Sequence, residues 1–207
     1  MSEGSERERG GAGRRGMIAA IAFAALGAAL AVAAALEWFG TPDEGGGARV
    51  GGPFALQATD GRTVTDKDFA GKAMLIYFGF TFCPDACPTA LSRMAAALDA
   101  LGPEGEAVQP ILITLDPARD TPDVLKEYVS LFHPRLIGLR GTPEETAAVA
   151  KDYRVYFELT EPDANGDYLV NHTDAIFLMG PDGRYLTLFG PDVDAQAMAE
   201  GIRHYLD

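Results

Sequence analysis

The chain has 207 residues and a formal net charge of −13, and 47% of its residues are hydrophobic. After residue 36 it carries 13 basic and 27 acidic side chains, so this part repels phosphate backbones and we expect no nucleic-acid partner. The length predicts one globular domain behind a leader of different composition. That domain is long enough to bury a core without disulfide bonds.

The leader contains an uncharged run from Met17 to Leu36, and 20 residues in a helix span the core of a bilayer. Arg14 and Arg15 precede this run and acidic residues follow it. The positive-inside rule then places the N-terminal tail in the cytoplasm and exports the body. The alternative is a cleaved signal peptide, because Ala33–Ala35 satisfies a small-residue cleavage site.

The expected organisation has four parts. We predict a cytoplasmic tail at 1–16, a transmembrane anchor at 17–39, a glycine-rich linker at 40–52 and one folded domain at 53–207.

Strands and helices alternate along the predicted domain. The uninterrupted apolar run AMLIYFGF is typical of a strand buried on both faces, and two Thr-Pro segments carry the signal of a helix start. This alternation predicts an α/β fold in which helices flank a mixed sheet. The expected strands are 54–59, 73–80, 108–115, 135–139, 153–159, 168–170, 173–179 and 185–189, with extended chain at 63–64; the expected helices are 88–101, 121–132, 142–151 and 194–206.

The chain has two cysteines, Cys83 and Cys87, directly after the strand expected at 73–80. A pair this close closes a tiny loop, so a disulfide here would stabilise the fold little through chain entropy. Cys87 lies at the expected helix start, where N–H groups and the helix dipole favour a thiolate. Two thiolates suit a soft ion such as Cu(I), whereas a structural zinc site normally needs four ligands.

Three blocks of the sequence resemble the signature blocks of the Sco/SenC family. They are YFGFTFCPDACP, LDPARDTP and YLVNHTDAIFLMGPDG, they occur in this order, and the resemblance runs from about Phe54 to the end. It implies a thioredoxin-like copper metallochaperone that helps to assemble the copper centre of cytochrome c oxidase. The implied ligands of one copper ion per chain, Cu(I) or Cu(II), are Cys83, Cys87 and His172. Asn171 departs from the family, whose members often carry Asp there.

The resemblance also implies partners and a location. The expected partners are the copper-accepting subunit of cytochrome c oxidase, a thiol reductant and, as a further candidate, an upstream copper donor. A reductant is expected because an exported pair tends toward a disulfide, which offers no thiolate ligands. The expected location is a bacterial inner membrane with a single span and the body on the periplasmic side. In a eukaryote it is the mitochondrial inner membrane, facing the intermembrane space.

The sequence also allows a second function. The protein could be a thiol-disulfide oxidoreductase that reduces the cysteines of the oxidase copper site. Thioredoxin-type enzymes place a cis-proline opposite their cysteines, and the stretch NHTDA at 171–175 has no proline, which favours metal binding. We therefore expect a metallochaperone rather than an enzyme, with the thiol-disulfide oxidoreductase as the alternative. We expect surface or capping roles for His133 and His204, and a loop-capping role for Asp116. The aromatic residues at 77, 78, 80 and 82 are expected in the core, with shielding of the metal as the alternative role of Phe82.

Overall fold

The computed structural model describes residues 49–206. The expected tail, the expected anchor at 17–39 and residues 40–48 of the expected linker lie outside this range. Within residues 49–206, no helix has the length and apolar character needed to cross a membrane. The described residues belong to one compact unit, in which the Gly51 amide donates to the Asp152 carbonyl over 2.8 Å.

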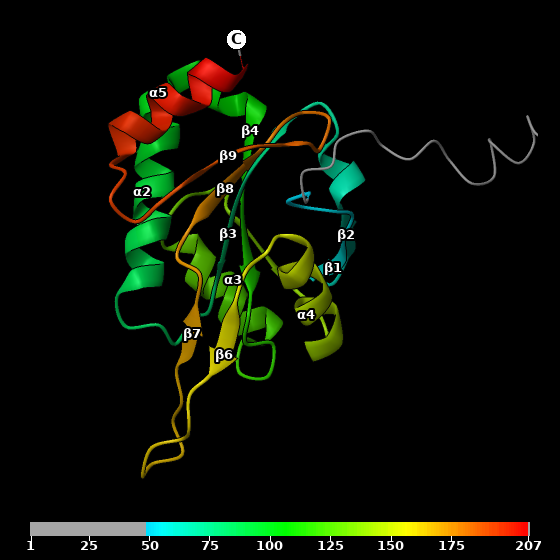
Figure 1. Cartoon of the computed structure of the whole chain (residues 1–207), viewed down its shortest axis with the longest axis vertical. Helices are drawn as coiled ribbons and strands as arrows, with labels where there is room; N and C mark the ends of the chain where they lie inside the picture. Colours follow the sequence, from blue (N-terminus) through cyan, green and yellow to red (C-terminus); the bar gives the residue numbers. More distant parts are fainter. Residues whose placement is uncertain (1–48, 207) are drawn as a thin grey trace, which may run out of the picture. The chain divides into compact units, whose positions relative to one another are not determined.

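A seven-stranded sheet forms the centre of this unit, in the order β2-β1-β5-β4-β3-β8-β9 (Figure 1). Strands β3, β4 and β5 run parallel, whereas β8 is antiparallel to β3 and β1 is antiparallel to β5. The mixed sheet expected from the sequence is therefore confirmed. The bounds are β1 Ala55–Ala58, β2 Thr63–Thr65, β3 Ala73–Gly79, β4 Val108–Thr114, β5 Ile137–Arg140, β8 Ile176–Met179 and β9 Tyr185–Phe189.

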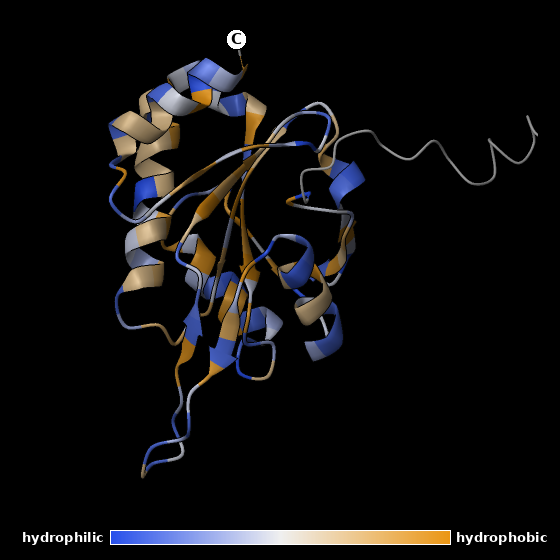
Figure 2. Ribbon diagram, viewed as in Figure 1, coloured by the Kyte–Doolittle hydropathy of each residue, from blue (hydrophilic) through white to orange (hydrophobic). Residues whose placement is uncertain are grey.

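The core lies around β3, which is buried at every position. Its sequence AMLIYFG presents apolar groups to both faces of the sheet, as expected for a strand covered on both sides. Figure 2 shows hydrophobic residues along the central strands. The carboxyl ends of β3 and β4 meet at one edge of the sheet, because these two parallel strands pair from Ala73 with Val108 to Gly79 with Thr114.

Four α-helices flank the sheet in the described part of the chain, and Figure 1 shows α2 and α5 together on one flank and α4 on the other. Thr121 and Thr142 cap α3 and α4 through their hydroxyl groups, which confirms both expected helix starts. The bounds are α2 Ala86–Leu101, α3 Pro122–Ser130, α4 Pro143–Asp152 and α5 Ala195–Leu206, with short 3-10 helices at Asp66–Phe69 (η1) and Gly102–Ala107 (η2).

The start expected for α2 was wrong. The helix begins at Ala86, so Pro88 lies inside its first turn and does not open it. This position tolerates proline because the first N–H groups of a helix have no partner within the helix.

A separate two-stranded sheet pairs β6 (Phe157–Leu159) with β7 (Val170–His172). The connecting loop projects beyond the main sheet (Figure 1). Here the expected strand bounds were wrong in one important respect. We expected His172 to precede a strand starting at residue 173, but it is the last residue of β7 and pairs with Phe157.

Candidate metal centre

The two cysteines lie in the loop that leads from β3 into α2, called here the cysteine loop (residues 80–87). Cys87 is the second residue of α2 and is fully buried, whereas Cys83 is half-buried one turn earlier. Both are free thiols, and the Cys87 amide donates a hydrogen bond to the Cys83 Sγ atom over 3.3 Å. The start of the helix thus gives one of its unpaired N–H groups to the first sulfur.

Gly79, at the end of β3, makes room for the second sulfur. A Cβ atom at this position would lie 2.9 Å from the Cys87 Sγ atom and 2.8 Å from a ring carbon of Tyr77. These distances are too short for any real side chain, so the close approach of the sulfur to the strand requires glycine. The sequence offered the glycine, but nothing in it showed that a sulfur lies against it.

His172 reaches the same place from β7. Its Nε2 atom lies 3.7 Å from the Cys87 Sγ atom, and its Nδ1 atom lies 3.0 Å from the Thr173 carbonyl oxygen. A carbonyl only accepts, so we assign the proton of the neutral ring to Nδ1. The lone pair of Nε2 then faces the sulfur, which is the state of a histidine that can bind a metal.

Two aromatic rings hold the imidazole in place. Tyr77 and Phe80 each meet the His172 ring edge-on, with ring centres 5.9 Å and 6.1 Å away. Tyr77 is fixed in turn, because its hydroxyl donates to the Asp174 carboxylate over 3.1 Å. The rotamer of the candidate ligand is therefore set by packing before any ion arrives.

One electrostatic expectation was wrong. We expected the helix start to favour a thiolate at Cys87, but burial raises the pKa of its thiol. The helix N–H groups do not outweigh the loss of water around a fully buried sulfur. Without a cation beside it, Cys87 is a neutral thiol, and a bound metal ion supplies the charge that lets such a group lose its proton.

The residues present fit copper by chemistry, because two sulfurs and one imidazole are donors that copper prefers. Within residues 49–206, however, no three His, Cys, Asp or Glu side chains are already arranged to hold a metal ion. Cys87 and His172 face each other, while the Cys83 sulfur is turned toward the Cys87 amide. Some movement of these side chains is therefore needed before all three donors can bind one ion.

The block LDPARDTP fixes the start of the cysteine loop. Asp120 is fully buried and accepts hydrogen bonds from the Thr81 amide at 3.1 Å, from the Thr81 hydroxyl and from the Thr114 hydroxyl. Burial raises the pKa of the Asp120 carboxyl. Asp116 caps the loop as expected, by accepting from the Arg119 amide over 3.4 Å, and it also accepts from the Tyr168 hydroxyl over 2.9 Å.

The other histidines and Phe82 do not belong to the group of candidate metal ligands. The His133 ring accepts from the Arg135 amide over 3.1 Å, so its capping role is confirmed, and His204 is exposed as expected, against Tyr205. The core position expected for Phe82 was wrong, since half of its side chain is exposed, at 50%.

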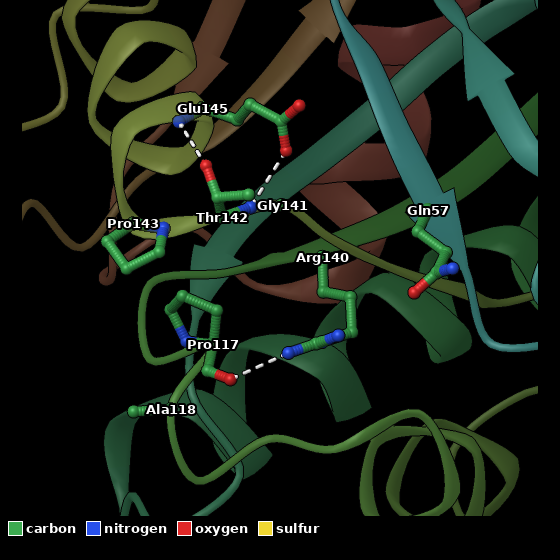
Figure 3. A pocket seen from close by; sticks show the side chains of 8 residues that line it. All are labelled: Gln57, Pro117, Ala118, Arg140, Gly141, Thr142, Pro143 and Glu145. Atoms are coloured by element: carbon green, nitrogen blue, oxygen red, sulfur yellow. Dashed lines mark hydrogen bonds between the residues drawn. The ribbon is translucent and has the colours of Figure 1, made fainter.

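A cavity of about 440 Å³ is lined in part by Pro117 and Ala118 of the loop that connects β4 with α3 (Figure 3). Arg140 crosses it and donates to the Pro117 carbonyl over 2.8 Å and to the Asp120 carbonyl over 3.2 Å. Glu145 lies on the opposite side and is used in the capping box of α4. Arg140 therefore holds the loop on which Asp116 and Asp120 lie.

A mixed sheet flanked by helices, with a cysteine pair where its central strand leads into the next helix, defines a thioredoxin-like α/β protein. The SCO1/SenC family model matches residues 42–207, and the chain belongs to this family. Protein SenC of Rhodobacter capsulatus is 43% identical over 162 residues, which cover 77% of this chain and 72% of that protein. The mitochondrial SCO1 homolog 1 of Arabidopsis thaliana is 45% identical over 158 residues, 76% of this chain and 47% of that protein.

Solved structures agree with this assignment. The copper-bound structure of Bradyrhizobium japonicum ScoI is 44% identical, with a TM-score of 0.70 over 76% of this chain and 99% of that one. Copper-bound yeast Sco1 is 42% identical, with a TM-score of 0.71. The chain spans about half the length of several relatives, with 47% of the Arabidopsis protein and 54% of yeast SCO2.

Proposed function

We propose that this protein is a copper metallochaperone that binds one copper ion through Cys83, Cys87 and His172 and passes it to the copper-accepting subunit of cytochrome c oxidase. The observation that carries the proposal is the approach of the His172 Nε2 atom to the Cys87 sulfur, 3.7 Å away at the carboxyl end of β3. Cys83 lies one turn away in the same loop and supplies the third donor.

Copper is supported in two independent ways. The donor set of two thiols and one neutral imidazole suits both Cu(I) and Cu(II). The related structures from Bradyrhizobium japonicum and yeast each hold copper. The oxidase as acceptor rests on the family resemblance, since that family helps to assemble the copper centre of the enzyme.

The exposure of the site allows copper to be transferred to a partner protein. Cys83 is half-buried and the neighbouring Phe82 is half exposed, so a partner can reach the ion from the side of the cysteine loop. Cys87 lies deep in the protein. Ligand exchange then begins at Cys83 and ends at Cys87.

We place the body outside the cytoplasm on an uncleaved anchor at 17–39. The support is the uncharged run of 20 residues behind Arg14 and Arg15. There, a thiol reductant is needed to keep Cys83 and Cys87 able to bind metal.

The second candidate function is a thiol-disulfide oxidoreductase. One observation favours it, namely that Cys83 is the more exposed sulfur and accepts an N–H from the helix start, as an attacking thiol does. It uses the same two sulfurs but assigns no task to His172.

Metal analysis of the reduced full-length protein tests the proposal. After anaerobic loading and desalting we expect one copper per chain, and none retained when Cys83→Ala is combined with Cys87→Ala. His204→Ala serves as the matched control, because this ring is exposed and packs on Tyr205. Copper binding that persists in the double cysteine variant would exclude the proposed site. A wild-type protein that reduces a peptide disulfide but binds no copper would favour the oxidoreductase.

A further inference from the structure

The two segments that carry the candidate ligands meet on one arginine. The guanidinium carbon of Arg119 lies 4.8 Å from the ring centre of Phe82 and 3.6 Å from that of Tyr168. Phe82 immediately precedes Cys83. Tyr168 precedes His172 by four residues, in the β6–β7 connection just before the strand β7 that delivers the imidazole. A cation that contacts both rings connects the cysteine loop with the β6–β7 hairpin.

The Arg119 side chain is itself held by an ion pair. The carboxylate of Asp116, only 2% exposed, pairs with its Nε atom and also accepts from the Tyr168 hydroxyl. Arg140, the last residue of β5, donates to two carbonyls of the loop that carries Arg119. One is the Pro117 carbonyl (Figure 3) and the other is that of Asp120. The Arg119 side chain therefore extends from an anchored loop. The cysteine loop and the β6–β7 hairpin pack on this side chain.

One nitrogen of the guanidinium, Nη2, is buried and has no hydrogen-bond partner among the described residues. Burying a donor unpaired costs free energy, so a purely structural ion pair would be expected to satisfy it. The planar contact with two aromatic rings is what keeps the group in this place. Lysine cannot reproduce that contact, since its ammonium is a compact and strongly hydrated charge.

We propose that Arg119 is a positioning residue that holds the cysteine loop and the β6–β7 hairpin in register, so that Cys83 and His172 face the same ion. This proposal rests on the proposed copper function, because it assigns Arg119 a task at that site. Within residues 49–206, the hydrogen bonds, ion pair and ring contacts of the Arg119 side chain go to Asp116, Phe82 and Tyr168 and not to the candidate ligands. Arg119 acts through Phe82 on one side and through Tyr168 on the other.

The test begins without metal, by hydrogen exchange of the full-length reduced protein. Two amides report on the two segments, that of Cys87 in the cysteine loop and that of Thr160, which donates to the Leu169 carbonyl across the hairpin. In Arg119→Met we expect both amides to exchange faster, by about two- to thirtyfold. Arg203→Met is the matched control, because Arg203 joins Glu104 and the Ala100 carbonyl at the other end of α2.

The second measurement uses Cu(II). We expect Arg119→Met to lose affinity by about 10- to 100-fold and to change the optical spectrum of the bound ion, with both thiols still titrating. Arg119→Lys should rescue little, because an ammonium does not reproduce the contact with the two rings. Phe82→Leu gives a variant that folds in any case, since Phe82 is half exposed, and it should speed exchange at Thr160 through the arginine.

Unchanged exchange at Thr160 in both Arg119→Met and Phe82→Leu would overturn the inference, as would a change confined to the cysteine loop. Unchanged Cu(II) affinity and spectrum in Arg119→Met would overturn it as well. A wild-type protein that binds no copper overturns the proposed function instead, and the exchange result still decides whether Arg119 connects the two segments.

Discussion

The Nε2 atom of His172 lies 3.7 Å from the Sγ atom of Cys87, although 85 positions separate these residues in the chain. The fold creates this contact by ending β3 and β7 at the same place. The Nδ1 atom of the ring is occupied by the Thr173 carbonyl, so only Nε2 is free to bind. The imidazole is thus oriented toward the sulfur without any ion.

His172→Ala separates the two candidate functions. The substitution should weaken Cu(II) binding by at least about 100-fold and Cu(I) binding much less, because Cu(II) depends more on the harder nitrogen donor. The Cys83–Cys87 disulfide should still form at the wild-type rate, since disulfide exchange needs only the sulfurs. Copper competition in both oxidation states and thiol titration measure these effects, with His204→Ala as the control.

If His172→Ala keeps wild-type affinity for both copper ions and cells that carry it retain oxidase activity, the histidine is not a ligand. The oxidoreductase would then be the better assignment.

Gly79→Ala should disturb the site directly. The added methyl group would lie 2.9 Å from the Cys87 sulfur, in a core with no space to accept it. We expect the free energy of unfolding to fall by about 1–3 kcal/mol and the copper affinity to fall with it. Gly190→Ala is the matched control, because a Cβ atom there meets nothing within 4 Å. Urea unfolding and copper competition on both variants check the prediction, which fails if the two alanines behave alike.

The sequence predicted the mixed sheet, its central strands and the capped starts of α3 and α4, because these depend on local signals. The run AMLIYFGF and the two Thr-Pro motifs each act within a few neighbouring residues. The start of α2 was missed because proline is tolerated throughout the first turn of a helix. The local pattern could not distinguish Pro88 at the first position from Pro88 at the third.

The candidate site was only partly predictable. The cysteine pair came from its spacing and thiol chemistry and His172 from motif resemblance, whereas the roles of Arg119 and Gly79 depend on contacts between segments distant in sequence. The protonation of Cys87 was missed for the same reason. Its position at a helix start is local and visible, but its burial under Tyr77 and β3 is a tertiary property.

The topology can be tested in cells. A reporter that is active only outside the cytoplasm, fused after Asp207, should be active and should fractionate with membranes, because Arg14 and Arg15 precede the uncharged run. Replacing these arginines with glutamates is the control and should reduce export. A soluble cytoplasmic product would contradict the topology, and a soluble exported product would contradict only the retained anchor.

The stability of the protein depends on pH through Asp120, and the surroundings of this carboxyl determine the sign of the dependence. Burial raises the pKa of this carboxyl in the folded protein, so folding favours its protonated form. Its contribution to stability is complete below the ordinary carboxyl pKa of about 4 and is lost as pH rises through the raised pKa. Asp182 behaves in the opposite way, because hydrogen bonds from the Arg184 amide and side chain lower its pKa. Its contribution is complete above pH ~4 and is lost on acidification.

Asp120→Asn therefore should gain stability relative to the wild type as pH rises above about 4, and the difference should level off once Asp120 is ionised. Asp182→Asn should show the opposite slope, with its loss of stability greatest at neutral pH. Urea unfolding of the wild type and both variants across this pH range measures the two differences. Because each variant removes a single titrating group, the acidic residues they share cancel in the comparison. A wild-type protein that gains stability over Asp120→Asn with rising pH would mean that the hydrogen bonds from Thr81 and Thr114 outweigh burial, and the pKa of Asp120 would then be lowered.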